Sequence, residues 1–323
     1  MPGTHAQSII FVNQVTGTQM PTLTNDLVII QRNPTSGAGR SGRVLLELIH
    51  ELRKRQFAVR MFSNPDRLDR FIDNDHVGHR IRCLVAAGGD GTVTSLFSRH
   101  PGRAIAVLPM GTENLVARYL KIPRDGHVVA DVIEHGRVRR FDTALAGDNQ
   151  FLLMASAGID AEIVRRMHAT RSGNIRHWTY LRPILSTIAC YRFPVINVTN
   201  VSTGETFTGS HVIVSNFREY GLNLQLNPDA EPADGQLDIC VFQGRSVTSS
   251  AIHTVSSLFK AQNGPLIVRF RSQHVSLSAA ADLHSAGQHR AKIPVQTDGD
   301  PAGQLPIHIR INPSAMQLLV HCP

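Results

Sequence analysis

The sequence lacks any apolar run approaching the ~20 residues that a membrane-spanning helix needs. Its four cysteines, Cys83, Cys190, Cys240 and Cys322, form no C-x-x-C pair. Three of them lie in apolar segments, which indicates buried reduced thiols rather than disulfides or a zinc site. The sixteen histidines show no H-E-x-x-H or other ligand spacing. We therefore expect neither a membrane-spanning helix nor a zinc or histidine-based metal site.

Apolar residues are also scarce at the N-terminus. Residues 1–24 are mostly polar, and their one apolar stretch, residues 8–12, is too short for the core of a signal peptide and follows no basic segment. We interpret residues 1–24 as a loose tail or a short added strand. The protein is expected to be cytoplasmic, with peripheral contact at the inner face of the membrane.

Aromatic residues make up only 6% of the sequence, whereas basic residues are in excess. The net charge is +8 and the pI is near 9.8, which suits nucleic acid, an anionic membrane or a phosphorylated substrate as a partner. Nucleic-acid binding is typically accompanied by aromatic side chains among the basic ones, or by a known motif. Because neither is found, the charge favours an anionic membrane surface over nucleic acid.

Two domains are predicted, because 323 residues are too many for one compact core. In the first half, apolar strands alternate with glycine-containing turns and amphipathic helices. This alternation predicts an α/β domain at residues 25–140, with a parallel sheet covered on both faces, to which the C-terminal strand can be added. Strands are expected at residues 26–32, 57–62, 82–87 and 104–108, and helices at residues 43–55, 66–72, from 93 and 115–120.

The second half is richer in strand patterns and predicts a β-sandwich domain at residues 141–323. Strands are expected at residues 150–155, 195–201, 211–215, 237–242, 266–270, 274–278, 307–311 and 316–320, and helices at residues 161–167, 178–191 and 247–260.

Glycine-containing turns follow three strands of the predicted parallel sheet, at the edge where such sheets bind ligands. Glycine lets the backbone approach a phosphate and turn its N–H groups toward it. The first turn contains G-x-G-x-x-G at residues 37–42, but the second strand ends at Ser63-Asn64 and not at the acid that a dinucleotide fingerprint requires. No Gly-Lys-[Ser/Thr] occurs, which excludes a Walker A loop.

The second turn, Gly88-Gly89-Asp90-Gly91-Thr92, is more specific than the first. Two glycines before the acid let a nucleotide lie against the strand end, and Asp90 can reach a metal-bound water or a hydroxyl group. Thr92 is expected to cap the next helix, with its side chain toward phosphate. A plain helix start would need only one of these polar residues.

The motifs resemble those of the diacylglycerol kinase catalytic family, which includes sphingosine kinases, ceramide kinases and bacterial lipid kinases. They are Asn33-Pro-x-Ser-Gly37, the turn at residues 88–92 and Pro109-x-Gly-Thr-x-Asn114, each after a strand. The resemblance continues with Asp234-Gly235-x-Leu-Asp238 and Asp298-Gly299-Asp300, and so spans residues 26–320. It implies a nucleotide-binding α/β domain, a β-sandwich domain at residues 141–323 that would bind the lipid substrate, and an active site between them.

Carried over residue by residue, the resemblance implies sites for ATP and Mg²⁺ in a lipid kinase of phospholipid metabolism. Asp298 would be the general base that takes the proton from the acceptor hydroxyl, with Asp300 at the position of the family's usual glutamate. Asp90 would help to place the catalytic Mg²⁺. A structural Mg²⁺ would be held by Asp234 and by backbone carbonyls of Glu231 and Gln236. The residues expected to contact ATP are Asn33, Pro34, Ser36, Gly37, Ser63, Gly88, Gly89, Asp90, Gly91, Thr92, Val93, Gly111, Thr112 and Asn114.

The residue types suit phosphoryl transfer, which requires positioning, neutralisation of charge by a metal and one carboxylate near the nucleophile. Mg²⁺ prefers hard oxygen ligands such as carboxylates. By themselves the two Asp-Gly pairs indicate hairpin turns, and the upstream motifs favour the catalytic role. Leu115 departs from the family, because the diacylglycerol branch usually has an aspartate there and the sphingoid branch does not.

The acceptor is expected to be a lipid alcohol, either diacylglycerol or a sphingoid-like lipid. Residues 178–191 carry Tyr180, Leu181, Ile184, Leu185 and Ile188 at helical spacing, a stripe that suits an acyl-chain groove but is also the pattern of a core helix. The sequence does not decide between these lipids, and it leaves a homodimer open.

Two alternatives remain. One is a nucleotide- or lipid-binding regulator with weakened catalysis, which Leu115 suggests. The other is an NAD kinase, a relative that shares the Gly-Gly-Asp-Gly-Thr turn. An NAD kinase should also carry an Asn-Glu pair and a Thr-Pro-Thr-Gly-Ser-type segment, and the sequence has neither.

Overall fold

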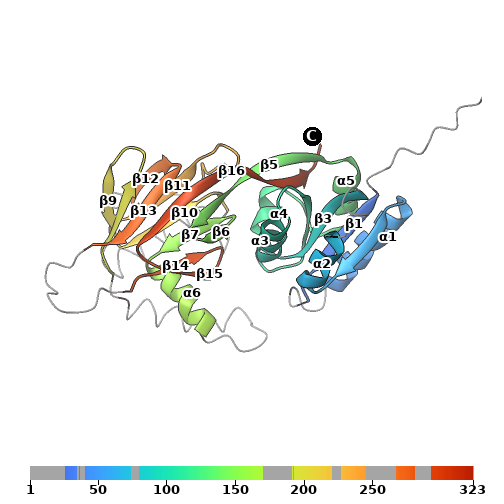
Figure 1. Ribbon diagram of the computed structural model, residues 1–323, viewed down its shortest axis with the longest axis horizontal. Coiled ribbons are helices and arrows are strands. Elements are labelled where there is room, and N and C mark those ends of the chain that lie inside the picture. The colour runs from blue at the N-terminus through green and yellow to red at the C-terminus, as the bar shows by residue number, and fades with distance from the viewer. Residues whose placement is uncertain are drawn as a thin grey trace, which may run out of the picture.

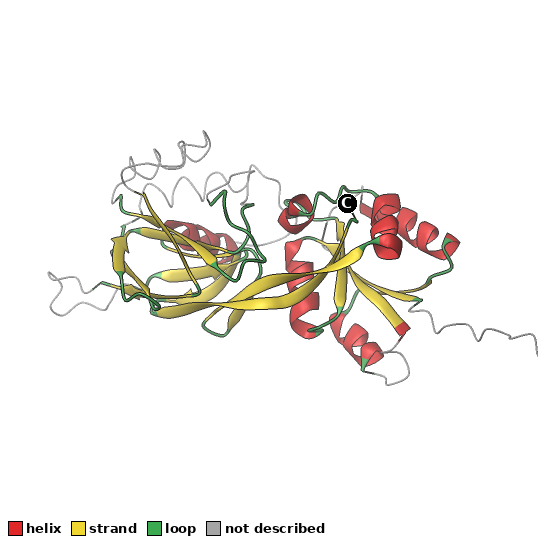
Figure 2. Cartoon of the chain, turned by 90° about the horizontal axis from the view of Figure 1, so that it is seen from above, coloured by secondary structure: helices red, strands yellow, loops and turns green. Residues whose placement is uncertain are grey.

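The computed structural model describes residues 26–34, 36, 41–73, 80–169, 191, 193–219, 227–244, 267–280 and 292–322. These residues form an α/β half and a β-rich half, which lie side by side along the long axis of the molecule (Figure 1). Two long strands, β5 (Arg137–Ala146) and β16 (Ile307–Val320), run from one half into the other (Figure 2). No helix in the described part of the chain is both long and apolar enough to cross a bilayer.

The α/β half is a parallel sheet with strand order β2-β1-β3-β4-β16, and helices cover both of its faces. Its strands are β1 (Leu27–Arg32), β2 (Ala58–Phe62), β3 (Ile81–Gly88) and β4 (Ala104–Pro109). Its helices are α1 (Ser41–Lys54), α2 (Pro65–Ile72), α3 (Asp90–Arg99), α4 (Leu115–Tyr119) and α5 (Gly126–His135).

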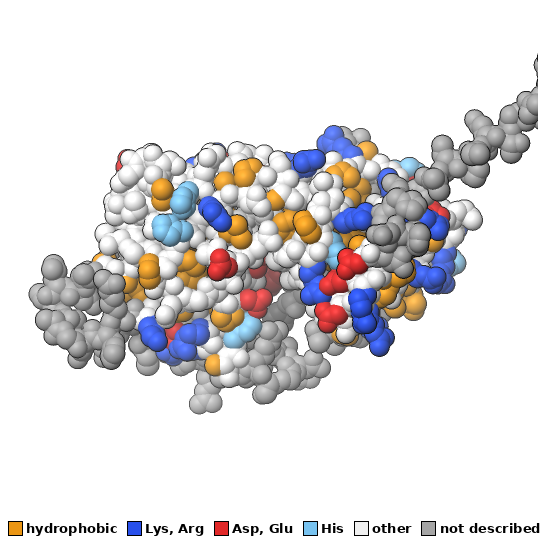
Figure 3. Space-filling view, in the orientation of Figure 1, with side chains coloured by type: hydrophobic (Ala, Val, Ile, Leu, Met, Phe, Trp, Pro, Cys, Tyr) orange, Lys and Arg blue, Asp and Glu red, His pale blue; other side chains and the backbone are white. Residues whose placement is uncertain are grey.

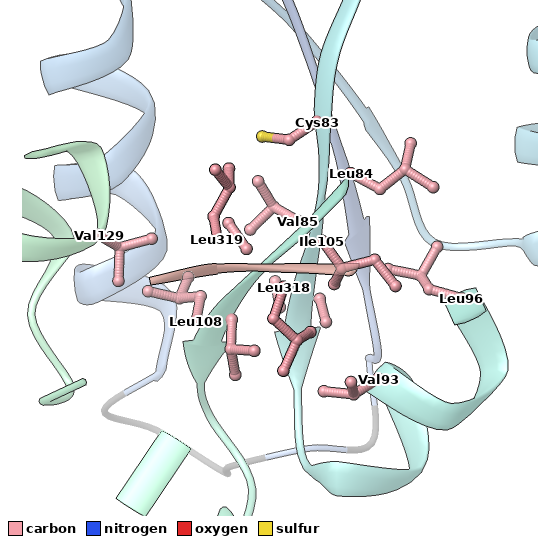
Figure 4. Packing of buried hydrophobic residues seen from close by; sticks show 14 of the residues in the cluster. Cys83, Leu84, Val85, Val93, Leu96, Ile105, Leu108, Val129, Leu318 and Leu319 are labelled. Carbon is pink, nitrogen blue, oxygen red and sulfur yellow. The ribbon is translucent and has the colours of Figure 1, made fainter. Parts of the chain in front are cut away.

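Side-chain alternation along the central strands explains how both faces are buried. In β3, Val85 lies on the side of Val129 from α5, whereas Leu84 points toward Leu96 of α3 (Figure 4). Each of these four side chains is at most 1% exposed. The predicted parallel sheet, covered on both faces, is confirmed.

The β-rich half consists of two sheets that pack face to face. The strands are β6 (Asn149–Phe151), β7 (Met154–Ala157), β8 (Ile196–Asn200), β9 (Thr206–Gly209), β10 (His211–Ser215), β11 (Leu237–Phe242), β12 (Ile267–Ser272), β13 (His274–Ala279), β14 (Pro294–Thr297) and β15 (Asp300–Gln304), with helix α6 (Ile159–Ala169).

One sheet of this half is antiparallel, with strand order β12-β11-β10-β7-β14-β15. The other sheet continues the first half's sheet through β16, β13, β8 and β9. Val212 and Val214 of β10 share a buried apolar core with Val275 and Leu277 of β13. The predicted β-sandwich is therefore confirmed.

Strand β16 belongs to both halves, and the prediction of two separate strands at residues 307–311 and 316–320 was wrong. Its first part pairs with β13, and its last part pairs in parallel with β4. Between them the register with β5 shifts at Asn312–Met316, and Ser314 has a φ of 54°. This segment reads as a turn in the sequence but forms a bulge inside one strand, as an extra residue in a ladder does.

Other elements of the structure also differ from those expected from the sequence. The strand expected at residues 150–155 is divided into β6 and β7, which lie in different sheets. Strands β5, β9, β14 and β15 and helix α5 were not predicted. The expectation that Thr92 caps α3 was wrong, because the N-cap residue is Gly89 and Thr92 lies inside the first turn. The helices expected at residues 178–191 and 247–260, and with them the acyl-chain groove, lie outside the described residues, apart from Tyr191.

Candidate active site

The first glycine-containing turn follows β1. Asn33 N donates to the carbonyl oxygen of Ala87 at 3.0 Å, and Ser36 N donates to the carbonyl oxygen of Asn33 at 3.2 Å. These bonds attach the turn to the end of β3 and bring Asn33 and Ser36 to the second motif. Pro34 is exposed beside them, and Gly37 lies outside the described residues.

The second and third turns touch each other through glycine. A Cβ on Gly111 would lie 2.6 Å from the Cα of Gly89, and a Cβ on Gly88 would lie 2.1 Å from the Thr92 hydroxyl. Both distances are too short for a side chain, so packing between the turns requires glycine at Gly111, and packing within the second turn requires glycine at Gly88. Gly91 faces open space, because a Cβ there would meet nothing within 4 Å.

Thr92 supplies the observation that best tests the fit of a phosphate ligand. Its side chain is 5% exposed, and no described group lies within hydrogen-bonding reach of its hydroxyl oxygen. A buried hydroxyl normally has a partner. Its place at the first turn of α3, where backbone N–H groups and the helix dipole favour anions, fits a phosphate oxygen.

Asp90 holds the third turn in place. Its two carboxylate oxygens accept the backbone N–H groups of Leu115 and Val116 at 2.9 and 3.0 Å. The carboxylate therefore caps the N-terminus of α4, a different helix from its own. Burial raises the pKa of Asp90, and these two N–H groups partly offset that rise.

Asn114 and Arg124 complete the third turn. Asn114 adopts a left-handed conformation, and its side-chain amide both accepts from Gly111 N and donates to the Gly111 carbonyl, each at 2.8 Å. Arg124 donates to the carbonyl oxygens of Pro109 and Gly111 at 2.9 and 2.6 Å. Asn114 thus shapes the turn, and Thr112 at its tip is exposed.

Asp298 lies in the two-residue turn between β14 and β15, which confirms the hairpin geometry of its Asp-Gly pair. Its Oδ1 accepts from Leu153 N and Met154 N at 2.8 and 3.0 Å, and its Oδ2 accepts from Leu152 N at 2.8 Å. The N–H groups of Leu152 and Leu153 belong to the break between β6 and β7, and that of Met154 belongs to the first residue of β7. Loss of strand pairing at residues 152–153 therefore creates the site for this carboxylate.

The Asp298 carboxylate contacts helix α3, which begins at Asp90, across the boundary of the two halves. Thr94, on α3, has its hydroxyl 3.3 Å from both Asp298 Oδ2 and the Asp90 carbonyl oxygen. Burial raises the pKa of Asp298 to about 6, three backbone N–H groups oppose the rise, and the charge of Asp90 adds to it. Acidic side chains border the hollow between the halves (Figure 3).

Asp300 and Ser63 lie at the margin of this site. The Asp300 side chain is 70% exposed and pairs with His168 Nε2 of α6 at 3.1 Å, so its carboxylate is not among the partners of Asp298. Ser63 is exposed at the end of the edge strand β2. Val93, by contrast, is 1% exposed and packs in the core, so its side chain does not face a ligand.

The residues expected to hold a structural Mg²⁺ do not fit that ion. The carbonyl oxygen of Glu231 already accepts two N–H groups, from Ala233 and Asp234, at 2.8 and 3.3 Å. The Asp234 carboxylate accepts from Gln236 N at 2.9 Å and lies 3.7 Å from the guanidinium of Arg271. A positive charge is thus already present where the cation would bind.

Sequence reasoning missed three residues that support the site. They are Thr94, Arg124 and Gln296. Gln296 is 2% exposed, accepts from Gly299 N at 2.8 Å and donates to Ser156 Oγ at 2.9 Å, so it holds the turn that carries Asp298. Nothing in the local pattern around Thr94 and Gln296 distinguishes them, because the partners that tie them to the site, Asp298 and Ser156, are more than a hundred residues away in the sequence.

Family models match both halves of the chain. Residues 27–146 match the diacylglycerol kinase catalytic domain, and residues 153–320 match the YegS C-terminal NAD kinase beta sandwich-like domain. The second match alone covers more than half of the chain.

Individual relatives agree with this assignment. Diacylglycerol kinase of Staphylococcus carnosus is 25% identical over 293 residues, 85% of this chain and 88% of the relative. Diacylglycerol kinase of Mycobacterium tuberculosis is 27% identical over 308 residues, 89% and 93% of the two chains. A crystal structure of a diacylglycerol kinase from Bacillus anthracis superposes with a TM-score of 0.66 at 17% identity, covering 92% and 97%, which supports the fold. The chain belongs to the diacylglycerol kinase catalytic domain family, with a YegS-like C-terminal domain.

Proposed function

We propose that this chain is an ATP-dependent lipid kinase that phosphorylates the hydroxyl group of a lipid alcohol, diacylglycerol or a sphingoid-like lipid. The observation that carries the proposal is the contact of the Asp298 carboxylate with α3, the helix that begins at Asp90: the Thr94 hydroxyl lies 3.3 Å from both Asp298 Oδ2 and the Asp90 carbonyl oxygen. A nucleotide side and an acceptor side would meet there, at the carboxyl ends of the parallel strands.

The α/β half supplies the nucleotide side. The triphosphate of ATP would lie on the turns after β1, β3 and β4, with a phosphate oxygen at the unpartnered Thr92 hydroxyl. The Asp90 oxygens accept backbone N–H groups of Leu115 and Val116, and the carboxylate can also offer a lone pair to the Mg²⁺ that accompanies ATP. That ion would neutralise charge on the phosphates.

Asp298 supplies the base. Its Oδ1 accepts two backbone N–H groups, but its Oδ2 accepts one and shares the Thr94 hydroxyl, whose proton can turn to the Asp90 carbonyl at the same distance of 3.3 Å. Oδ2 is therefore the oxygen available to an acceptor hydroxyl. As the acceptor oxygen bonds to the γ-phosphorus and ADP leaves, the acceptor proton passes to Oδ2.

The pKa of about 6 suits this role. It leaves Asp298 ionised at neutral pH and makes it a stronger base than an ordinary carboxylate, so the protonation state and the driving force for proton transfer are both favourable. Removing Thr94 or Asp90 would change that value through a hydrogen bond or a neighbouring charge.

The choice of a lipid acceptor is supported by the relatives, which are diacylglycerol kinases, and by the net charge of +8, which favours an anionic membrane surface. A regulator that binds nucleotide without transferring phosphate is the second candidate. It is favoured by Leu115, which is 5% exposed and places an apolar side chain where the diacylglycerol branch usually has an acid.

Incubating the full chain with γ-labelled ATP and vesicles of diacylglycerol, sphingosine, ceramide or an isoprenoid alcohol separates these candidates. A kinase labels one lipid and releases ADP only when that lipid is present. A regulator binds ATP in calorimetry and releases no ADP. NAD in a parallel reaction tests the NAD kinase alternative, and label on NAD alone would contradict the lipid-kinase proposal.

A further inference from the structure

The acidic turn, residues 229–238, carries the positions at which the family resemblance implies a structural Mg²⁺. We propose that in this chain arginine side chains take the place of that ion, so that the turn folds and joins the two halves without a divalent cation. The inference concerns how the molecule is held together and does not depend on the proposed reaction.

Arg271, on β12, is the first of these arginines. Its Nε donates to Asp238 Oδ1 at 3.1 Å, its NH2 donates to the Asp229 carbonyl at 3.0 Å, and its NH1 lies 3.7 Å from Asp234 Oδ2. One guanidinium group therefore contacts both ends and the middle of the acidic turn. Its planar set of donors can contact several oxygens at once, as a bound cation does.

Glu231 joins the turn to the α/β half. Its Oε1 accepts the Tyr119 hydroxyl of α4 at 2.5 Å and Arg139 of β5 at 2.8 Å, and its Oε2 accepts Arg218 at 3.1 Å. The Arg218 guanidinium also lies over the Tyr119 ring, 5.2 Å from its centre. Because both of its carboxylate oxygens accept hydrogen bonds, the Glu231 side chain connects the two halves and is not available as a metal ligand.

The backbone of the turn is held by a buried acid from outside it. Asp142, on β5, is 2% exposed, and its two oxygens accept Ser314 N and Gly235 N, each at 2.7 Å. Its own N–H donates to the Pro232 carbonyl at 2.7 Å. Asp142 thus joins the acidic turn to the bulge of β16, so a protein group already supplies the cross-link that a metal would provide.

These contacts mean that a divalent ion would compete with the Arg271 guanidinium and with backbone N–H groups for the same oxygens. A divalent ion at Asp234 would lie beside the Arg271 guanidinium, and it would need the Glu231 carbonyl, which accepts two N–H groups. Like charges so close repel, and a carbonyl with both lone pairs engaged is a poor ligand.

The test uses the full chain without nucleotide, treated with a chelator and then desalted. We expect less than ~0.1 magnesium per chain by elemental analysis, and the same melting temperature with and without millimolar Mg²⁺, since an ion that binds the folded chain would raise it. One retained magnesium per chain, or a fall in melting temperature on chelation that Asp234→Asn abolishes, would overturn the proposal. Neither readout requires turnover, so failure of the lipid-kinase proposal would leave this test intact.

Arg271→Met sharpens the test. We expect its melting temperature to fall by several degrees and to recover in part with Mg²⁺, because Asp234 and Asp238 are then free to bind the ion. Arg310→Met, an exposed arginine on the other sheet, serves as the matched control and should remain near the parent. An unchanged melting temperature for Arg271→Met, or no recovery with Mg²⁺, would contradict the replacement. If Arg271→Met does not fold, the melting temperature of Arg271→Lys with and without Mg²⁺ is measured instead. The magnesium content of the parent then remains the second readout of the proposal.

Discussion

Asp90 in the α/β half and Asp298 in the β-rich half are both half-buried carboxylates held by backbone N–H groups, but they are held over very different distances in the sequence. The partners of Asp90 lie 25 and 26 residues away, in the next turn of the same half. Those of Asp298 lie about 145 residues away, at the break between β6 and β7. The nucleotide turns organise one another, whereas the Asp298 turn depends on the assembled sandwich.

The comparison also shows that the two parts of the site are positioned by different features of the fold. Neighbouring turns of a parallel sheet lie at one edge whatever the rest of the molecule does, so their motifs are recognisable. The base is positioned by strands from both sheets and by the buried Gln296. Mutations in the two regions should therefore impair different properties: phosphoryl transfer at Asp298, and stability or ATP affinity in the nucleotide turns.

The largest effect is expected for Asp298→Ala. Loss of the base should lower kcat by ~10²- to 10⁴-fold while ATP affinity stays within a few fold, since the base acts in the transition state. Phosphoryl transfer and calorimetric ATP binding measure the two quantities. Asp300→Ala is the matched control, because that exposed carboxylate pairs with His168, and we expect a smaller loss from it. Equal losses in the two variants would refute the assignment of the base.

A second pair of variants separates packing from phosphate binding in the nucleotide turns. Gly111→Ala should destabilise the fold by ~1–3 kcal/mol, because its Cβ would lie 2.6 Å from the Gly89 backbone. Gly89→Ala should unfold like the parent, since its Cβ has only a 3.4 Å contact, but should bind ATP more weakly. Denaturant unfolding and calorimetry distinguish the two, and normal ATP affinity in Gly89→Ala would show that phosphate does not approach this turn.

The smallest effect is expected for Thr94→Val, the residue that contacts both regions. In the parent, kcat should rise about tenfold per pH unit up to the pKa of Asp298, about 6, and then level off, because only the ionised carboxylate accepts the proton. The Thr94 hydroxyl favours the ionised form, so its removal should move this limb to higher pH, and Thr94→Ser should restore it. A profile unchanged in Thr94→Val would show that the hydroxyl does not bond to Asp298.

Much of the fold and part of the site could be predicted because the signals are local. The strands at residues 26–32 and 104–108 were found within one residue of β1 and β4, since continuous apolar runs between glycine-containing turns mark buried parallel strands. Strands β14 and β15 were missed because Asp298-Gly299 joins two short segments with little apolar alternation. Thr92 was assigned a capping role from its residue type alone, whereas α3 begins at Asp90.

By itself the sequence determined the alternation of strands and helices over residues 26–120, the glycines at the turns and the presence of an aspartate at each candidate position, because these depend on short-range pattern and on covalent order. Only the tertiary structure decided that Asp298 contacts α3 through Thr94, that β16 is one strand shared by both halves, and that Arg271 lies beside Asp234. Those outcomes arise from pairing and ion contacts between segments far apart in the chain, and such contacts form only when the two halves assemble.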